Sequence, residues 1–336
     1  MAAEFENIIP FEIIEIILSK SHSWNTIISD PAFVENYLRS SSENSPSNLF
    51  VSTYQMKGTE IGFSRLKFED GKINGDGILE NIPSGFNIIF AECNGLLLMA
   101  SSTNPFFRRR YALCNPTTRQ KTLVAFPDAF NEGNVVSHGV CYDHATNDFK
   151  IVMIAERNYA VYSCNDESWT RKKLFRTAYY SVTCAPGIFV DGATYWVLRE
   201  QNRTHVVYFD SRTDELKFLP KPEELNSSDY DGYNLYISLA CLRGGLCLYC
   251  MYNDSSRVRM WMKEKGIFVN CWNEFATIEN FPKEIWWSEA IGSVENKIVI
   301  QIPGNKFVYY SPSENTIEEV VEDTDIPFGR LIPYRN

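Results

Sequence analysis

Two sequence markers that recur about every fifty residues constrain the fold of this chain more than any other feature. The first is a short turn between two apolar runs, and a longer turn of the same kind, DHATND, is centred near Thr146. The short turns are Asn94-Gly95, Asp191-Gly192, Gly244-Gly245 and Glu295-Asn296. Taken at 94, 146, 191, 244 and 295, the turns are 52, 45, 53 and 51 residues apart. Such turns between apolar runs predict β-hairpins.

The second marker is an apolar strand that ends in a polar residue, called the hinge residue below. The hinge residues are Asn115, Ser163, Asp210, Lys263 and Ser311, with spacings of 48, 47, 53 and 48. In three units an apolar residue follows six positions after the hinge residue, as expected if a fourth strand turns the same face inward each time: Trp169, Leu216 and Ile317. Because both markers share one period, they favour a structural repeat.

Four short strands in a unit of about fifty residues match the period of kelch-type propeller blades. Five units are marked, and residues 48–68 could supply a sixth or close the ring. The sequence therefore predicts a mainly β, propeller-like domain of about five to six blades. The kelch signature of a double glycine with paired Tyr and Trp does not recur. A β-sandwich or two stacked barrels is the structural alternative, since evenly spaced short strands fit those folds too.

Charge and composition narrow the class of partner. The chain has 336 residues, 44 % of them hydrophobic, which is enough for a large core. Its net charge of −10 leaves no excess of Lys and Arg to replace phosphate counterions, so we expect no nucleic-acid partner. An acidic chain attracts basic protein surfaces more readily, which makes a basic target the mild preference.

The N-terminus and the cysteines suggest a compartment. MAAEFENIIPFEIIEIIL has glutamates where a secretory signal has positive charge, and no run of 18 apolar residues occurs, so we expect no membrane association and a location in cytoplasm or nucleus. Nine cysteines lie mostly in apolar, strand-like segments, which fits buried, reduced thiols. Cys247 and Cys250 have metal-ligand spacing but lack a second pair, so we expect neither a metal nor a cofactor.

No catalytic motif is apparent. The four histidines do not form HExxH, and GxSxG, P-loop and GxGxxG motifs are missing. Five aspartates lie at predicted turns, where Asp is favoured for its geometry: Asp143, Asp148, Asp166, Asp210 and Asp214. Some propellers are glycosidases, so a propeller-fold hydrolase is kept as a remote alternative to the predicted non-enzymatic protein.

The N-terminal residues resemble an F-box with its centre missing. IPFEIIEIILSK, residues 9–20, resembles the F-box opening Leu-Pro-x-Asp/Glu-Val/Leu, and SWNTIISDPAF, residues 23–33, resembles its close. Pro10 and the following glutamates suit a helix N-terminus. Between the two pieces an F-box normally has a further helix, but here only Ser21 and His22 occupy its place.

The rest of the chain resembles the F-box-associated domain of plant F-box proteins over most of its length. The matching pieces are CNGLL (93–97), CNPTTR (114–119), GVCYD (139–143) with DFKIV (148–152), VYS (161–163) with SW (168–169), FVDGATYW (189–196), YFD (208–210) and VRMWMKEKG (258–266). Their order is the specific feature. The resemblance implies the substrate receptor of a Skp–cullin–F-box (SCF) ubiquitin ligase, in which the F-box docks the Skp adaptor, which connects to a cullin–RING ligase, and the associated domain captures the target.

The resemblance also implies which residues contact the adaptor. They are the apolar and proline residues of both F-box pieces: Pro10, Ile13, Ile14, Ile17, Leu18, Trp24, Ile27, Ile28 and Pro31. A second interpretation is that the first helix caps the open end of the propeller and buries Ile13 and Ile17. In that case the chain is a non-catalytic binding module that has lost adaptor docking.

These observations predict two domains and one set of candidate binding loops. Residues 1–40 are expected to form a short helical, truncated F-box, and residues 48–336 the propeller-like domain. Target recognition is assigned to loops, because loops carry most binding residues of rigid scaffolds. The candidate loops are residues 101–110, 199–204, 222–234 and 252–257.

Overall fold

The computed structural model divides the chain into two compact units, residues 1–45 and 46–336. All the residues it describes belong to the second unit: 49–55, 61–69, 72–78, 82, 85–101, 110–116, 120–127, 135–174, 180–181, 186–200, 203–226, 235–252, 257–279, 281, 289–294, 296–302, 306–322 and 328–333. The predicted truncated F-box therefore lies outside the described residues.

The described residues form six sheets, called blades 1 to 6 in the order of their second strands along the chain. Blade 1 contains β26 (Phe328–Pro333), β1 (Leu49–Gln55), β2 (Ile61–Glu69), β3 (Lys72–Ile78) and β25 (Val321–Glu322). Blade 2 contains β4 (Phe86–Cys93), β5 (Leu96–Ser101), β6 (Tyr111–Asn115) and β7 (Gln120–Val124). Blade 3 contains β8 (Val135–Asp143), β9 (Asp148–Ala155), β10 (Asn158–Ser163) and β11 (Ser168–Lys173).

The remaining blades follow the same pattern. Blade 4 contains β12 (Tyr180–Ser181) and β13 (Ile188–Val190), which both pair with β14 (Ala193–Glu200), then β15 (Arg203–Asp210) and β16 (Glu215–Leu219). A turn of 3₁₀ helix, η2 (Glu223–Asn226), follows it. Blade 5 contains β17 (Leu235–Leu242), β18 (Gly245–Tyr252), β19 (Val258–Lys263) and β20 (Trp272–Ile278). Blade 6 contains β21 (Glu289–Val294), β22 (Lys297–Ile302), β23 (Lys306–Ser311) and β24 (Thr316–Glu319).

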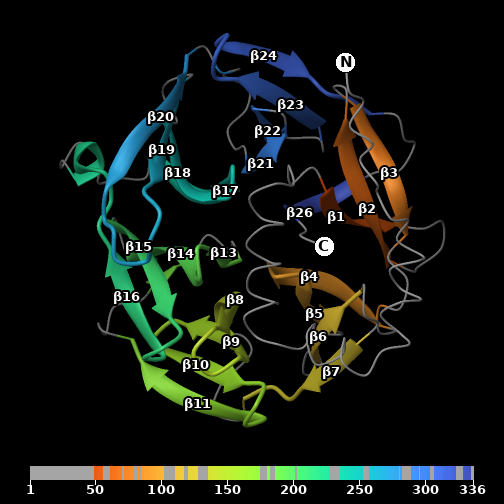
Figure 1. The fold of residues 1–336 in the computed structure, drawn as a ribbon, viewed down its shortest axis with the longest axis vertical. Coiled ribbons are helices and arrows are strands. Elements are labelled where there is room, and N and C mark those ends of the chain that lie inside the picture. Colours follow the sequence, from red (N-terminus) through yellow and green to blue (C-terminus); the bar gives the residue numbers. More distant parts are fainter. Residues whose placement is uncertain are drawn as a thin grey trace, which may run out of the picture. The chain divides into compact units, whose positions relative to one another are not determined.

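The blades follow one another around a central axis, with the first strand of each blade innermost (Figure 1). Inner strands of successive blades contact each other: β26 with β4, β4 with β8, β8 with β14, β13 with β17, β17 with β21, and β21 with β26. The last contact returns to blade 1 and closes the ring. The predicted propeller of about five to six blades is therefore confirmed, and the sandwich alternative is wrong.

The core of the domain is divided among the spaces between blades. Six large clusters of buried residues each combine side chains from two neighbouring blades, so that every adjacent pair of blades has one. A strand inside such a blade must bury both of its faces, which explains its nearly continuous apolar sequence. In β18, for example, Leu248 and Cys250 pack toward blade 4, whereas Cys247 and Tyr249 pack toward blade 6.

Blade 1 joins the two ends of the domain. The C-terminal strand β26 pairs antiparallel with β1 and supplies the inner strand, while β1, β2 and β3 come from the N-terminal side. Strands β1 and β2, which lie within residues 48–68, thus supply a sixth blade and, through the pairing of β1 with β26, close the ring. The short strand β25 adds to the outer edge of β3 in parallel orientation.

Three of the predicted turns are confirmed, including the one between Asp143 and Asp148, and one is corrected, while Glu295 of the fifth lies outside the described residues. Asn94-Gly95 and Asp191-Gly192 connect the paired strands with positive φ at both residues (51° and 75°, 52° and 78°), as a type I′ hairpin requires. In blade 5 the turn is Arg243-Gly244, with φ of 50° and 70°, and not Gly244-Gly245, because Leu242 pairs with Gly245. A Cβ at Gly245 would come within 2.9 Å of the Met262 methyl carbon, so a larger residue there would require the flexible Met262 side chain to move.

The predicted hinge residues are also confirmed. Each of the five is the last residue of the third strand of its blade: Asn115, Ser163, Asp210, Lys263 and Ser311. The apolar residue six positions later occupies one register in three blades, opposite an aromatic residue of the third strand. The pairs are Tyr162 with Trp169, Phe209 with Leu216, and Tyr310 with Ile317.

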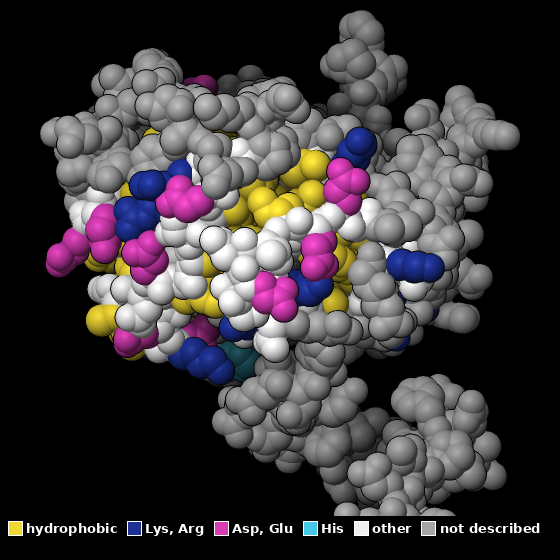
Figure 2. Space-filling model, turned by 90° about the horizontal axis from the view of Figure 1, so that it is seen from above, with side chains coloured by type: hydrophobic (Ala, Val, Ile, Leu, Met, Phe, Trp, Pro, Cys, Tyr) yellow, Lys and Arg dark blue, Asp and Glu magenta, His cyan; other side chains and the backbone are white. Residues whose placement is uncertain are grey.

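In blades 3 and 5 a tryptophan of the outer strand donates a hydrogen bond to the preceding blade. The Trp169 indole N–H donates to the carbonyl of Ala125, 2.7 Å away, and the Trp272 indole N–H donates to that of Pro220, also at 2.7 Å. Both acceptors follow the outer strand of the neighbouring blade. The part of the rim shown in Figure 2 carries Lys and Arg interspersed with Asp and Glu, the usual protection of exposed strand edges.

The described cysteines follow the prediction in part, since five are buried, Cys164 and Cys241 are half-buried and Cys271 is exposed. All eight described cysteines are free thiols, and only Cys271 of these is exposed, so the expectation that it is buried in a strand is wrong. Cys271 instead ends the connection between β19 and β20. Among the described residues no helix has the length and apolarity to cross a membrane.

Trp196 is enclosed by backbone at the interface of blades 3 and 4. Its side chain is 1 % exposed, and its indole N–H donates to the carbonyl of His138 at 3.2 Å. The Gly187 amide donates to the same carbonyl at 2.7 Å. A Cβ at Gly139 would lie 2.3 Å from Trp196 Cζ2, so the close approach of the two blades requires glycine there.

We therefore expect Gly139→Ala to lower the free energy of unfolding by about 1–3 kcal/mol, because the added methyl overpacks the Trp196 ring. The measurement is urea unfolding followed by tryptophan fluorescence. Thr122→Ala on the exposed strand β7 is the control and should change the value by less than about 0.5 kcal/mol. Equal stability of Gly139→Ala and the native chain would contradict the prediction, because it would show that the interface of blades 3 and 4 accommodates the added methyl.

Candidate functional site: the two faces of the propeller

The antiparallel blades give the domain two different faces. One carries the connections between first and second strands and between third and fourth strands, and it is called the turn face below. The other carries the connections between second and third strands and from each blade to the next, and it is called the loop face. Binding residues could therefore gather on either face, and each face has its own chemistry.

An ion network joins blades 3 and 4 on the turn face. The Lys150 ammonium lies 3.1 Å from Asp143 Oδ2 and donates to Asp214 Oδ1 and the Ser211 carbonyl, both at 2.7 Å. The Lys150 and Asp143 side chains are 10 % and 2 % exposed. Lys172 donates to the Asp214 carbonyl at 2.8 Å, so two cations of blade 3 hold the turn of residues 211–214.

Hydrogen bonding keeps this buried network charged. Burial alone would raise the pKa of Asp143, but hydrogen bonds from Thr146 and Lys150 outweigh it and lower that pKa below its ordinary value of 3.8. Burial alone would lower the pKa of Lys150, yet its bonds to Asp214 and Asp143 raise it above 10.5. The network therefore stabilises the fold above the ordinary Asp pKa and below the ordinary Lys pKa.

The hinge residue Asp210 organises a second charged group. Its side chain is 2 % exposed and accepts from Arg212 through Nε and Nη2, at 3.1 and 3.2 Å, and from Lys217 Nζ at 2.8 Å. Burial raises the pKa of Asp210, but these bonds lower it overall. One buried carboxylate thus holds two cations, and both of them reach the surface of the turn face.

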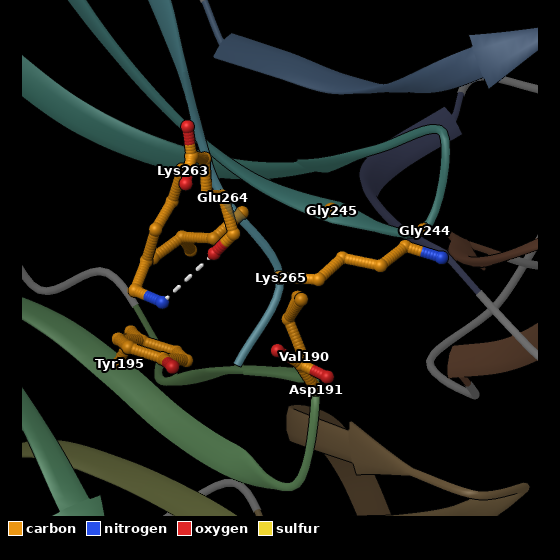
Figure 3. Close-up of a pocket in the computed structure, with 9 residues that line it drawn as sticks. Val190, Asp191, Tyr195, Gly244, Gly245, Lys263, Glu264 and Lys265 are labelled. Carbon is orange, nitrogen blue, oxygen red and sulfur yellow. Dashed lines mark hydrogen bonds between the residues drawn. The ribbon is translucent and has the colours of Figure 1, made fainter. Parts of the chain in front are cut away.

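A hollow lies between blades 4 and 5 on the turn face (Figure 3). It is lined by Val190, Asp191, Tyr195, Gly244, Gly245, Leu246, Lys263, Glu264 and Lys265. Its total empty volume, including the open mouth, is about 230 Å³, which is below the size of usual small-molecule sites. No group of His, Cys, Asp or Glu in the described part of the chain could hold a metal ion.

The polar groups of the hollow differ in how well they are satisfied. Lys263 donates to the carbonyls of Glu264 and Gly266, at 3.1 and 2.5 Å, and burial lowers its pKa. The Tyr195 hydroxyl is buried without a hydrogen-bond partner among the described residues. Burial and the nearby Asp191 raise the pKa of Tyr195 far above its ordinary value. The hydroxyl is therefore a stability cost to the fold.

The described ends of all four predicted recognition loops lie on the loop face. The loops 101–110, 199–204 and 252–257 connect second and third strands, and 222–234 lies between blades 4 and 5. Their described ends are well fixed: the Ser101 amide donates to the Arg110 carbonyl at 3.0 Å, and Arg199 donates to the Leu235 carbonyl at 2.9 Å. Their role in binding stays a prediction. The predicted adaptor-binding residues, from Pro10 to Pro31, lie outside the described residues.

The family of the chain is decided by a match over most of its length. The family model of the F-box associated β-propeller domain matches residues 51–324. The chain belongs to this family. The resemblance noted in the sequence, and the mainly β fold it implied, are thereby confirmed.

Curated relatives are plant F-box proteins. The chain is 22 % identical over 259 residues to F-box protein CPR1 of Arabidopsis thaliana, covering 66 % of this chain and 60 % of the relative. It is 24 % identical over 216 residues to the Arabidopsis F-box/kelch-repeat protein At3g23880, covering 60 % and 57 %. The match thus spans about three fifths of these relatives.

Among solved structures, the Cps50 (Swd1) β-propeller domain of Myceliophteria thermophila is similar with a TM-score of 0.44 and 10 % identity. The match covers 86 % of this chain and 87 % of that domain.

Sequence reasoning found the turn-face carboxylates but missed their partners. The sequence places Asp143, Asp210 and Asp214 at turns; Asp143 and Asp210 end the strands that precede turns, and Asp214 lies in one. The contact between Lys150 and Asp214 could not be inferred, because the two residues are 64 positions apart and Lys150 lies inside an apolar strand. The available signal was the lysine itself, since a charge in a buried strand needs a partner.

Removing the Lys150 cation should destabilise the F-box-associated domain strongly. We expect Lys150→Met to lower the free energy of unfolding by about 3–5 kcal/mol at pH 7, because Asp143 is left buried and charged. The loss should shrink as the pH falls and Asp143 becomes protonated in the variant. Urea unfolding from pH 7 toward pH 3 measures this loss. Lys172→Met is the control, because Lys172 donates to the carbonyls of Thr213 and Asp214, and its loss should be smaller and should not follow the protonation of Asp143. A pH-independent loss would contradict the assignment.

The unsatisfied hydroxyl gives a prediction with the opposite sign. Tyr195 and Tyr249 are both 1 % exposed, but the Tyr249 hydroxyl accepts from the Ala290 amide at 3.2 Å. We expect Tyr195→Phe to leave stability unchanged or to raise it by about 1 kcal/mol, and Tyr249→Phe to lower it by about 1–3 kcal/mol. Thermal and urea unfolding of both variants measure the difference, and equal losses would show that Tyr195 has a partner.

Proposed function

We propose that the protein is the substrate-recognition subunit of an SCF-type ubiquitin ligase. The observation that carries the proposal is the family match over residues 51–324, together with relatives that are F-box proteins. Support comes from the geometry, because a closed ring of six blades presents two broad, rigid faces. In this function the chain binds a target protein and performs no chemistry itself.

In this function the chain acts by positioning the target protein next to the ligase. The target is held on the propeller while residues 1–40 dock the Skp adaptor, which connects to a cullin–RING ligase. Holding two reactants together raises their effective concentration, and a rigid platform avoids the entropy cost of ordering a flexible one. The proposed contacts to the adaptor are Pro10, Ile13, Ile14, Ile17, Leu18, Trp24, Ile27, Ile28 and Pro31. The proposed location is cytoplasm or nucleus.

A second candidate function follows from the shortened F-box sequence. Only Ser21 and His22 stand between its two matching pieces, so part of the apolar contact to an adaptor is missing. Without docking, the same propeller would bind its target and shield it from a ligase. The two functions share the target and differ in adaptor binding.

Adaptor affinity separates these functions. Binding of the purified chain to the Skp adaptor is measured by calorimetry beside a variant with an intact F-box centre grafted between Lys20 and Ser23. The proposed function predicts that the natural chain binds within about tenfold of the graft, a difference of about 1.4 kcal/mol. Ile13→Asp with Ile17→Asp is the control and should abolish binding. If only the graft binds, the shielding function is favoured.

A further inference from the structure

The connection between β19 and β20 departs from those at equivalent positions. The third and fourth strands of blades 2, 3, 4 and 6 are joined by four residues each: 116–119, 164–167, 211–214 and 312–315. In blade 5 the connection has eight residues, Glu264–Cys271, called the blade 5 hairpin below. The Glu264 amide donates to the Cys271 carbonyl at 3.0 Å, and Val269 to Gly266 at 3.1 Å, so the extra residues form an ordered extension.

Blade 4 holds this hairpin in place. The Gly266 amide donates to the Asp191 carboxylate, and Gly266 has φ of 107°, a conformation that favours glycine. Ile267 packs against the core cluster between blades 4 and 5. From its own blade, Lys263 donates to the Gly266 carbonyl. The tip is therefore fixed from two blades, and a partner would bind it without ordering it first.

The fixed hairpin presents an aromatic ring to solvent. Phe268 is 63 % exposed, one of the three exposed large hydrophobic residues in the described part of the chain. The Arg212 guanidinium lies 4.5 Å from its ring centroid, and Arg212 is itself held by the buried Asp210. An exposed aromatic ring fixed beside an arginine has the composition of a protein-binding hot spot.

The charged groups on and beside the blade 5 hairpin differ in how far the chain itself pairs them. Asp210 accepts from Arg212 and Lys217, and Asp191 accepts from Gly266. Glu264 accepts from Asn273 at 3.2 Å. The exposed Lys265 ammonium has no acceptor among the described residues, and Figure 3 shows its side chain extending away from Lys263. Lys265 is therefore available to donate to a carboxylate of a partner.

We propose that the blade 5 hairpin is a docking site for an extended peptide segment of the target, in which an apolar side chain stands next to an Asp or Glu. The apolar side chain packs on Phe268, and the carboxylate accepts from Lys265. This inference rests on the proposed function and names the chemistry of its target. It assigns an acidic segment to the turn face, although the chain as a whole is acidic.

Peptide selection tests the docking site without any ligase component. Random peptides displayed on phage are selected on the purified full chain, and selected peptides are resynthesised for affinity measurement. We expect enrichment of an apolar residue beside Asp or Glu, a loss of at least about tenfold in affinity with Phe268→Ala, and a similar loss with Lys265→Glu. Because Phe268 is exposed, Phe268→Ala should keep the native unfolding midpoint.

Leu123→Ala is the matched control, since Leu123 is 66 % exposed on β7 of blade 2 and should not affect these peptides. Selection of no peptide, of peptides lacking acidic residues, or of peptides that bind Phe268→Ala as well as the native chain would overturn the proposal. Because the adaptor is absent, failure here leaves the adaptor measurement unaffected, and failure of adaptor docking leaves this result standing.

Discussion

Every blade of this domain depends on the blades beside it. Each inner strand is apolar on both faces, and a four-stranded sheet cannot cover both alone, so its stability lies in the clusters between blades. Closing the ring is therefore the decisive step. Pairing of β26 with β1 completes blade 1, and its side chains fill the last two clusters, with Ile332 on one side and Phe68 on the other. The two ends of the domain are thus coupled in folding.

Some charged and polar side chains, like the apolar clusters, make contacts between neighbouring blades. Polar contacts of the turn face also connect neighbouring blades, in addition to the ion pairs that lie within one blade. Lys150 reaches from blade 3 to the turn of blade 4, and Asp191 of blade 4 holds the hairpin of blade 5. Such contacts are specific in direction, in contrast to the non-directional apolar clusters. A ring built from repeated apolar blades gains a defined geometry from them.

The fold was predictable from sequence because the residues that form its turns and end its strands are recognisable locally. Turns such as Asn94-Gly95 need residues that tolerate positive φ, and the hinge residues end strands, so both repeat visibly with the blade. The error at Arg243 has the same origin: Gly244-Gly245 looked like the turn because arginine at positive φ is unusual. The site was less predictable. Lys150 and Phe268 gain their roles from residues 64 and 56 positions away, and such separations leave no local signal.

The net charge and the local chemistry of the turn face favour different partners. A charge of −10 acts over the whole surface and influences encounter rates, but salt screens it over about 8 Å at physiological ionic strength. Affinity depends on groups that meet directly, so the charges at the contact matter more for it than the net charge of the chain. At the blade 5 hairpin the carboxylates accept bonds from within the chain, while Lys265 does not donate to any described residue. An acidic protein can therefore select an acidic segment where its surface presents a cation that the chain itself does not pair.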